Sequence, residues 1–184
     1  MTTSPEQKES ENKIPEGLDM YFDKEVAASF SAREQNEKNF RVAEIVDRVI
    51  AEETQNTPDP LHVAELGGGA HPDRYHHFFD QLLSDPKGQI DWVDISPAML
   101  ELAEEYLSDQ KYERRREVIR FIKSDILEYL AGQDDSSLDL AIMKYTFDHI
   151  QKPEKLFELL SHKLKPTGKM IATMGMLKPE LKSI

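Results

Sequence analysis

The sequence predicts an α/β fold built on a doubly wound, mostly parallel sheet. Short apolar runs alternate with segments of helical spacing, and the runs are at residues 62–66, 89–94, 118–123, 138–145 and 169–176. Strands that alternate with helices indicate parallel pairing through right-handed crossovers. The first run passes an acidic residue and three glycines before a proline, and this order of strand, glycine loop and helix is typical of a small-molecule site.

Composition narrows the class of protein. At 184 residues the chain is long enough for one domain. Its formal net charge of −12 disfavours a nucleic-acid partner, because an acidic surface repels phosphates. The absence of cysteine excludes disulfides and thiolate metal ligands. With neither a signal-like start nor an apolar run near the roughly 18 residues of a membrane span, we expect a cytoplasmic protein with no membrane partner.

Three regions are expected along the chain. Residues 1–17 are polar and charged, which predicts a disordered tail. Residues 18–60 carry helical spacing and then a linker with two prolines, which predicts one or two amphipathic helices with a break near Ser31. Tyr21 in this region is a candidate for a lid over a ligand, or equally for a staple that holds the helix to the sheet. Residues 61–184 form the core that carries the sheet.

Prolines and serines mark where helices begin in the core. Pro72 is expected at the first position of a helix that runs to about Ser84, because a proline there loses no hydrogen bond. Ser96 is expected to cap the next helix, which has Pro97 in its first turn. Residues 126–130 predict a short helix before the fourth strand.

The last part of the chain predicts one more helix and an edge strand. Pro153 opens a helix whose apolar side comprises Leu156, Phe157, Leu160 and Leu164. Residues 165–168 predict a tight turn before the fifth strand. The chain stops at Ile184, soon after that strand, so we expect an open sheet edge. Either the chain is part of a longer protein, or a partner such as a second copy in a homodimer covers this edge.

Acidic side chains are found where the predicted strands end. Glu65 follows the first strand, Asp94 ends the second and Asp125 follows the third. In an open parallel sheet, ligands bind beyond these ends. Asp94 suits the two hydroxyls of a ribose, Asp125 suits the amino group of an adenine, and Glu65 suits an amino-acid ammonium. S-adenosylmethionine combines all three groups.

At this point the sequence resembles the class I S-adenosylmethionine-dependent methyltransferases over about residues 61–176. Five segments match the motifs of that family in order: Glu65-Leu66-Gly67-Gly68-Gly69, Val93 to Leu100, Ser124-Asp125-Ile126, Leu138 to Ile142, and Leu164 to Lys169. One glycine loop alone is a weak signal, whereas five motifs in order are strong together. The resemblance implies a Rossmann-like core with strand order 3-2-1-4-5, from which the family's last two strands are missing here.

The resemblance also implies a cofactor site. In it, Glu65 and the glycines hold the methionine part, Asp94 holds the ribose, Ile95 and Met99 line the adenine, and Asp125 meets the adenine edge. The full set of expected cofactor-binding residues is Glu65, Gly67, Gly68, Gly69, Asp94, Ile95, Met99, Ser124, Asp125, Ile126 and Lys144. S-adenosylmethionine is the expected cofactor, and no metal is expected.

The expected activity is in-line transfer of a methyl group to an O, N or C atom of a small molecule. Lys144 and Tyr145 are implied to lie beside the sulfonium and the substrate. Tyr145, Asp148 and His149 are the catalytic candidates, with Asp148 and His149 as a general base or, equally, as a helix cap and a packing residue. Methyl transfer often needs no base, because the sulfonium is already activated and alignment supplies much of the rate. The alternative hypothesis is a non-catalytic, methyltransferase-like module that acts through its open edge.

Two other interpretations of the glycine loop are disfavoured. A dinucleotide site would need a small residue at Pro72 and a ribose acid about 20 residues on, whereas Asp94 comes 29 residues after Glu65. His71 stands where the methyltransferase family has a third glycine, and we interpret it as a loop residue rather than a ligand contact. A metal site at His71 and the two histidines 76 and 77 is also disfavoured, because side chains of neighbouring helical residues diverge.

Overall fold

The computed structural model describes residues 22–34, 37–55, 60–72, 75–83 and 88–173. The expected tail at residues 1–17 and the expected lid residue Tyr21 lie outside these ranges. No helix within them is both long and apolar enough to cross a membrane.

Five parallel strands form one sheet in the order β3-β2-β1-β4-β5. The strands are β1 (His62–Leu66), β2 (Gln89–Asp94), β3 (Ile119–Lys123), β4 (Leu138–Lys144) and β5 (Leu164–Thr173). The predicted fold class and strand order are therefore confirmed. Strand order reverses between β1 and β4, and the carboxyl ends of these two strands are where a doubly wound sheet places its ligand.

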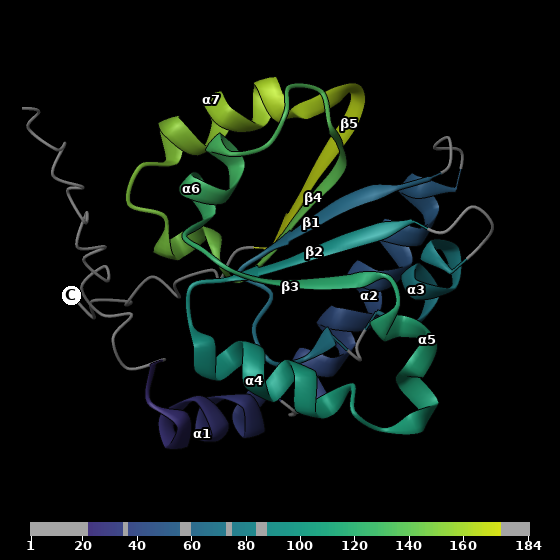
Figure 1. Cartoon of the computed structure of the whole chain (residues 1–184), viewed down its shortest axis with the longest axis vertical. Coiled ribbons are helices and arrows are strands. Elements are labelled where there is room, and N and C mark those ends of the chain that lie inside the picture. The colour runs from purple at the N-terminus through teal and green to yellow at the C-terminus, as the bar shows by residue number, and fades with distance from the viewer. Residues whose placement is uncertain (1–21, 35–36, 56–59, 73–74, 84–87, 174–184) are drawn as a thin grey trace, which may run out of the picture.

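Helices cover both faces of the sheet (Figure 1). One layer contains α2 (Glu37–Thr54), α3 (His76–Leu82) and α4 (Pro97–Tyr106), and the other contains α6 (Ile126–Ala131) and α7 (Pro153–Lys163). Two separate apolar clusters fill the spaces, one around the buried Trp92 under the first layer and one around Leu130 and Leu156 under the second. The remaining elements are α1 (Lys24–Glu34), α5 (Glu113–Arg116) and the short 3-10 turns Gln110–Tyr112 and Phe147–His149.

Two helix boundaries differ from the sequence prediction. Two helices are found where one or two were predicted, but the first does not break at Ser31: α1 ends at Glu34 and α2 begins at Glu37. The prediction that Pro72 opens a helix is wrong, because α3 begins only at His76. The amino end of α3 is held by α2: the backbone N–H groups of His77 and Phe78 each donate to Asp47 at 2.9 Å. This cap comes from a distant residue and therefore leaves no local signal.

The cap at Ser96 is confirmed, whereas two residues predicted on the apolar side of α7 are not buried in it: Phe157 is exposed, and Leu164 is the first residue of β5. Ser96 caps α4, accepting from the Met99 N–H at 3.1 Å. In α7, Leu156 and Leu160 are buried, but Phe157 is 51% exposed, so it does not belong to the buried side. Its ring instead lies 5.8 Å from that of Phe147.

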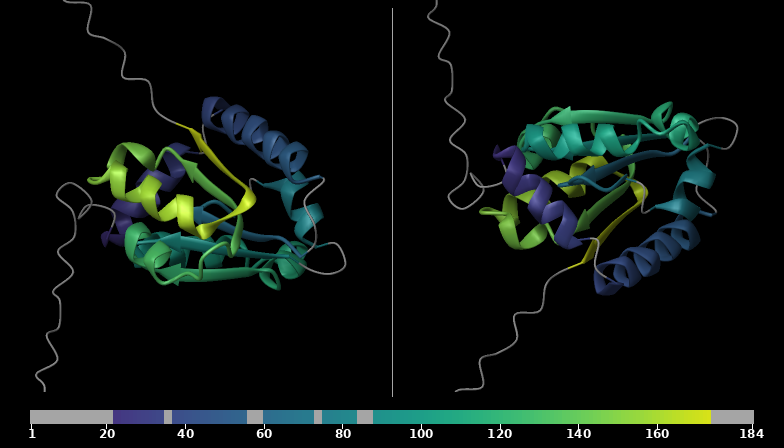
Figure 2. Two further views of the ribbon diagram at one scale, coloured as in Figure 1. Left: turned by 90° about the horizontal axis from the view of Figure 1, so that it is seen from above. Right: turned by 90° about the horizontal axis from the view of Figure 1, so that it is seen from below.

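The last strand begins earlier than predicted. β5 pairs with β4 at Leu138↔Leu164, and the ladder resumes at Leu140↔Lys169, so residues 165–168 interrupt the pairing where the tight turn was expected. Among the described strands β5 lies at the edge of the sheet, and α2 runs beside it (Figure 2). Lys169 of β5 forms an ion pair with Glu53 of α2, which is a side-chain contact and leaves the β5 edge without a strand partner in the described part of the chain.

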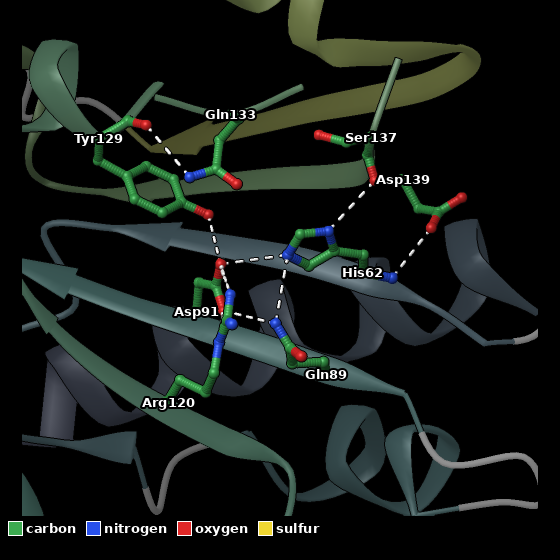
Figure 3. Close-up of polar contacts among 8 residues, drawn as sticks. All are labelled: His62, Gln89, Asp91, Arg120, Tyr129, Gln133, Ser137 and Asp139. Atoms are coloured by element: carbon green, nitrogen blue, oxygen red, sulfur yellow. Dashed lines mark hydrogen bonds and ion pairs between the residues drawn. The ribbon is translucent and has the colours of Figure 1, made fainter. Parts of the chain in front are cut away.

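A buried acid organises the amino half of the sheet (Figure 3). Asp91 of β2 has no exposed side-chain surface and accepts hydrogen bonds from His62, Gln89, Arg120 and Tyr129, at 2.7 to 3.1 Å. Burial by itself raises the pKa of a carboxyl, but here the hydrogen bonds outweigh burial and hold the pKa of Asp91 well below its usual range. The network therefore fixes three neighbouring strands and α6 around an ionised carboxylate.

Candidate functional site

The loop after β1 packs so tightly that its glycines are required by space and by backbone angle. Gly67 and Gly69 have φ of +78° and +62°, a region that side chains disfavour. A Cβ on Gly67 would lie 2.3 Å from the Thr146 side chain, and one on Gly68 would lie 2.3 Å from the Trp92 ring. A Cβ on Gly69 would meet nothing within 4 Å. The loop is thus fixed at its first two glycines and open at its third.

The backbone donors of this loop are used inside the protein. The N–H groups of Gly67 and Gly68 both donate to the Val93 carbonyl, at 2.8 and 3.0 Å. The N–H of Gly69 donates to the Asp94 carboxylate at 2.9 Å. These bonds tie the loop to the end of β2. Polar recognition at this end of the sheet is therefore left to side chains more than to the glycine N–H groups.

Glu65 is a fully buried carboxyl at the end of β1. Its Oε1 accepts from the Tyr75 hydroxyl at 3.0 Å, and its Oε2 is buried without a hydrogen-bond partner. Burial raises the pKa of Glu65 to about 7, against the charge of Lys144 and the Tyr75 hydrogen bond, which both lower it. A carboxylate buried from water in this way is stabilised most by a cationic ligand group that donates a hydrogen bond to Oε2.

Asp94 lies at the end of β2 and is 9% exposed. It accepts from the backbone N–H groups of Gly69 at 2.9 Å and Ser96 at 2.8 Å. A carboxylate accepts about four hydrogen bonds, so these two do not exclude ribose hydroxyls. Ile95 is half-buried, and Met99 is buried in a small apolar cluster with Ala27, Ala70 and Ala98, next to the loop.

The residues after β3 have clear local roles. Asp125 is half-buried and caps α6, because its Oδ1 accepts from the Leu127 and Glu128 N–H groups at 2.8 and 3.3 Å. The Ser124 N–H donates to the Asp94 carbonyl at 3.1 Å, which joins the ends of β3 and β2. Ile126 packs into the cluster under α6 and α7. The cap accounts for an acid at position 125 independently of any ligand.

The end of β4 lies against the loop. Lys144 is buried, and the Thr146 hydroxyl donates to the Gly67 carbonyl at 3.3 Å. Tyr145 is half-buried and has a φ of +58°, which is strained for an aromatic residue. Its N–H donates to the carbonyl of Thr173, at the end of β5. Asp148 and His149 lie one turn further on and are exposed.

His71 joins the loop to α1. It is a buried loop residue, and its Nε2 lies 2.9 Å from the hydroxyl and 3.0 Å from the carbonyl of Ser31. Its ring lies 4.8 Å from that of Tyr106. No three His, Asp or Glu side chains in the described ranges are arranged to hold a metal ion. His71 therefore anchors the N-terminal helix onto the loop.

The structure thus brings Glu65, Asp94, Lys144 and the glycines together at the switch point of the sheet. Sequence reasoning missed Tyr75, which contacts Glu65 and is fully buried. The only signal for it was an aromatic residue shortly after the loop, which is too common a pattern to indicate a role.

Comparisons with known proteins show the family and the fold of this chain. A family model described as a methyltransferase domain matches residues 62–183. The phosphoethanolamine N-methyltransferase 2 of Caenorhabditis elegans is 30% identical over 109 residues, which is 59% of this chain and 22% of that protein. The chain thus spans about a fifth of the length of this curated relative.

Solved structures share the fold. The plantazolicin methyltransferase BpumL in complex with SAH aligns with a TM-score of 0.61 at 16% identity, over 84% of this chain and 55% of BpumL. A SAM-dependent methyltransferase from Aquifex aeolicus aligns with a TM-score of 0.57 at 18% identity, over 86% of this chain and 78% of that one. The carbon methyltransferase of CurJ aligns with a TM-score of 0.66 at 15% identity, over 86% of this chain and 40% of that one.

A doubly wound sheet with buried acids around a glycine loop defines a cofactor-binding α/β protein. The chain belongs to the methyltransferase domain family. Membership of this family implies S-adenosylmethionine as the cofactor.

Proposed function

We propose that the protein is a methyltransferase that transfers a methyl group in line from S-adenosylmethionine to an O, N or C atom of a small molecule. One observation carries the proposal: Oε2 of Glu65 is buried without a partner beside the glycine loop, whose last glycine is bound by Asp94. These residues fit the cofactor, with Glu65 for its ammonium and Asp94 for its ribose. Ile95 and Met99 would line the adenine. The bound cofactor supplies an electrophilic methyl group on a sulfonium.

The proposed substrate class rests on charge and on the relatives. A net charge of −12 disfavours nucleic acids as acceptors. The curated relative is named as a phosphoethanolamine N-methyltransferase, and phosphoethanolamine is therefore the first acceptor to assay with labelled cofactor. Tyr145, Asp148 and His149 are the residues we propose near the acceptor. The cytoplasmic location stays a prediction from the sequence.

Calorimetric titration with S-adenosylhomocysteine tests the cofactor site. Asp94→Asn removes a charged acceptor and is expected to weaken binding by about 10- to 100-fold. Asp139→Asn is the matched control, because Asp139 is a similarly buried acid that binds Lys165 at the amino end of β4. Its affinity should equal that of the wild type. Absence of binding by the wild-type chain, or equal losses in both variants, would contradict the assignment.

The second candidate function is a non-catalytic module that associates through its edge. The observation in its favour is that β5 is one of the two edge strands of the described sheet and that each of its residues is half-buried or exposed. Light scattering distinguishes the two hypotheses in combination with the titration. A homodimer that binds no S-adenosylhomocysteine favours the module, and a monomer that binds it favours the enzyme.

A further inference from the structure

Two aromatic side chains connect Glu65 to the glycine loop. Tyr75 immediately precedes α3 and is fully buried, and its hydroxyl donates to Glu65 Oε1 at 3.0 Å. Its ring meets the Trp92 ring edge-on, with centroids 5.9 Å apart. The Trp92 indole N–H in turn donates to the Gly69 carbonyl at 2.9 Å. The acid and the loop are thus held in one continuous packed unit.

Tyr75 also contacts the cation of the site. The ammonium of Lys144 lies 5.1 Å from the centroid of the Tyr75 ring, which is the range of a cation–π contact. Lys144 is buried at the end of β4 and carries the charge opposite to that of Glu65. Tyr75 therefore meets the acid with its hydroxyl and the cation with its ring.

We propose that Tyr75 is a positioning residue for cofactor recognition, which occupies Oε1 of Glu65 and so leaves Oε2 as the oxygen that binds the cofactor ammonium. This inference rests on the proposed function. It follows from an asymmetry of the carboxyl: Oε1 has the hydroxyl donor, whereas Oε2 is buried with no donor from the protein. Because Tyr75 is packed against Trp92, it also fixes the distance between that oxygen and the loop.

The hydroxyl has a second effect on Glu65. A donor stabilises the ionised carboxyl over the protonated one, and only the ionised form attracts an ammonium. Among the described residues, Lys144 and Tyr75 are the groups that favour ionisation of Glu65, against the burial that raises its pKa to about 7. Cofactor affinity in the wild type should therefore increase as the pH rises through about 7.

Calorimetric titration of the full chain with S-adenosylhomocysteine across neutral pH tests the inference. Tyr75→Phe removes one oxygen and keeps the ring. We expect the pH at which affinity rises to be about one unit higher in this variant than in the wild type. Binding should therefore be about tenfold weaker near neutrality and should recover at higher pH. Tyr129→Phe is the matched control. It loses an equivalent hydrogen bond, to Asp91 at 2.7 Å, outside the cofactor site, and should keep the wild-type profile.

Two further variants separate positioning from structure. In a Glu65→Gln background, adding Tyr75→Phe should change affinity by less than about twofold, because the group through which Tyr75 acts no longer titrates. Tyr75→Leu, which also lacks the hydroxyl, should move the profile in the same direction as Tyr75→Phe. An equal loss at every pH, or an unchanged loss in the Glu65→Gln background, overturns the inference. A wild-type chain that binds no S-adenosylhomocysteine overturns the proposed function instead.

Discussion

Replacing Glu65 by glutamine should protect the ligand-free protein from a loss of stability at higher pH. In the wild type this carboxyl is fully buried, and its pKa is raised from 4.5 to about 7. Between these two values the folded state holds a proton that the unfolded state has released. The free energy of unfolding therefore falls as the pH rises through this window, and Glu65→Gln, which does not titrate, escapes that loss.

The magnitude follows from the pKa shift. At about 1.4 kcal/mol per pKa unit, a rise of the pKa from 4.5 to about 7 lowers the free energy of unfolding by about 3 kcal/mol once the pH has crossed the whole window. The attraction of Lys144 is already contained in that pKa. Because the isoelectric point is about 4.9, measurements should begin at about pH 5.5. Between that pH and about pH 8.5, the free energy of unfolding of Glu65→Gln should rise by about 2 kcal/mol relative to that of the wild type. This corresponds to about 4–8 °C in melting temperature.

Thermal and urea unfolding of both proteins at these two pH values measure the change. Glu104→Gln makes the same substitution on an exposed position of α4 and should show no such trend. A stability difference between Glu65→Gln and the wild type that stays constant over this range would refute the burial argument. A concentration of S-adenosylhomocysteine that saturates the wild type should raise the melting temperature of the wild type at the higher pH by more than that of Glu65→Gln, because the variant binds the ligand more weakly.

Other substitutions test the packing around the site. Gly68→Ala should lower the free energy of unfolding by more than about 2 kcal/mol and weaken S-adenosylhomocysteine binding, because its Cβ would overlap the Trp92 ring. Gly69→Ala should lower the free energy of unfolding by only about 1–2 kcal/mol through backbone strain, since its Cβ would meet no neighbour. A larger loss of stability in Gly69→Ala than in Gly68→Ala by urea unfolding would contradict this. Asp91→Asn should cost about 2–4 kcal/mol by urea unfolding, with titration showing unchanged S-adenosylhomocysteine affinity in the folded protein. A changed affinity would show that the two ends of the sheet are coupled.

Local signals explain how much of the fold was predictable. β1 and β2 are short, mostly apolar runs bounded by glycine, proline or an acid, and a parallel sheet hides both faces of such runs. Ser96 with Pro97 marked the start of α4 because the cap is made within one turn. The acids at positions 65 and 94 could be assigned to one end of the sheet, since parallel strands end on the same side.

Contacts between distant residues explain what was missed. The bond from Tyr75 to Glu65 joins residues 10 apart, and that from His71 to Ser31 joins residues 40 apart. Neither pair has a periodicity that a sequence can display. The α3 cap by Asp47 is equally remote, and the prediction at Pro72 failed for that reason.

The Asp91 network had a partial signal. An acid inside an apolar strand must find donors, because an unpaired buried charge is costly. Strand register decides which donors these are, and Asp91 lies directly beside Arg120 of β3. The sequence shows the need for partners, whereas only the sheet identifies them.

The contact between His71 and Ser31 makes α1 part of the structural unit that holds the glycine loop. Residues 24–34 carry none of the family's motifs, and the family match begins only at residue 62. Even so, Ala27 is buried against Ala70 and Met99, and Ser31 holds His71. A truncation made at the boundary of the family match would remove the helix that packs against Ala70 and Met99 beside the loop. Loss of binding in such a fragment would then reflect the missing helix, and the bounds of the family match alone are a poor guide to where this protein can be cut.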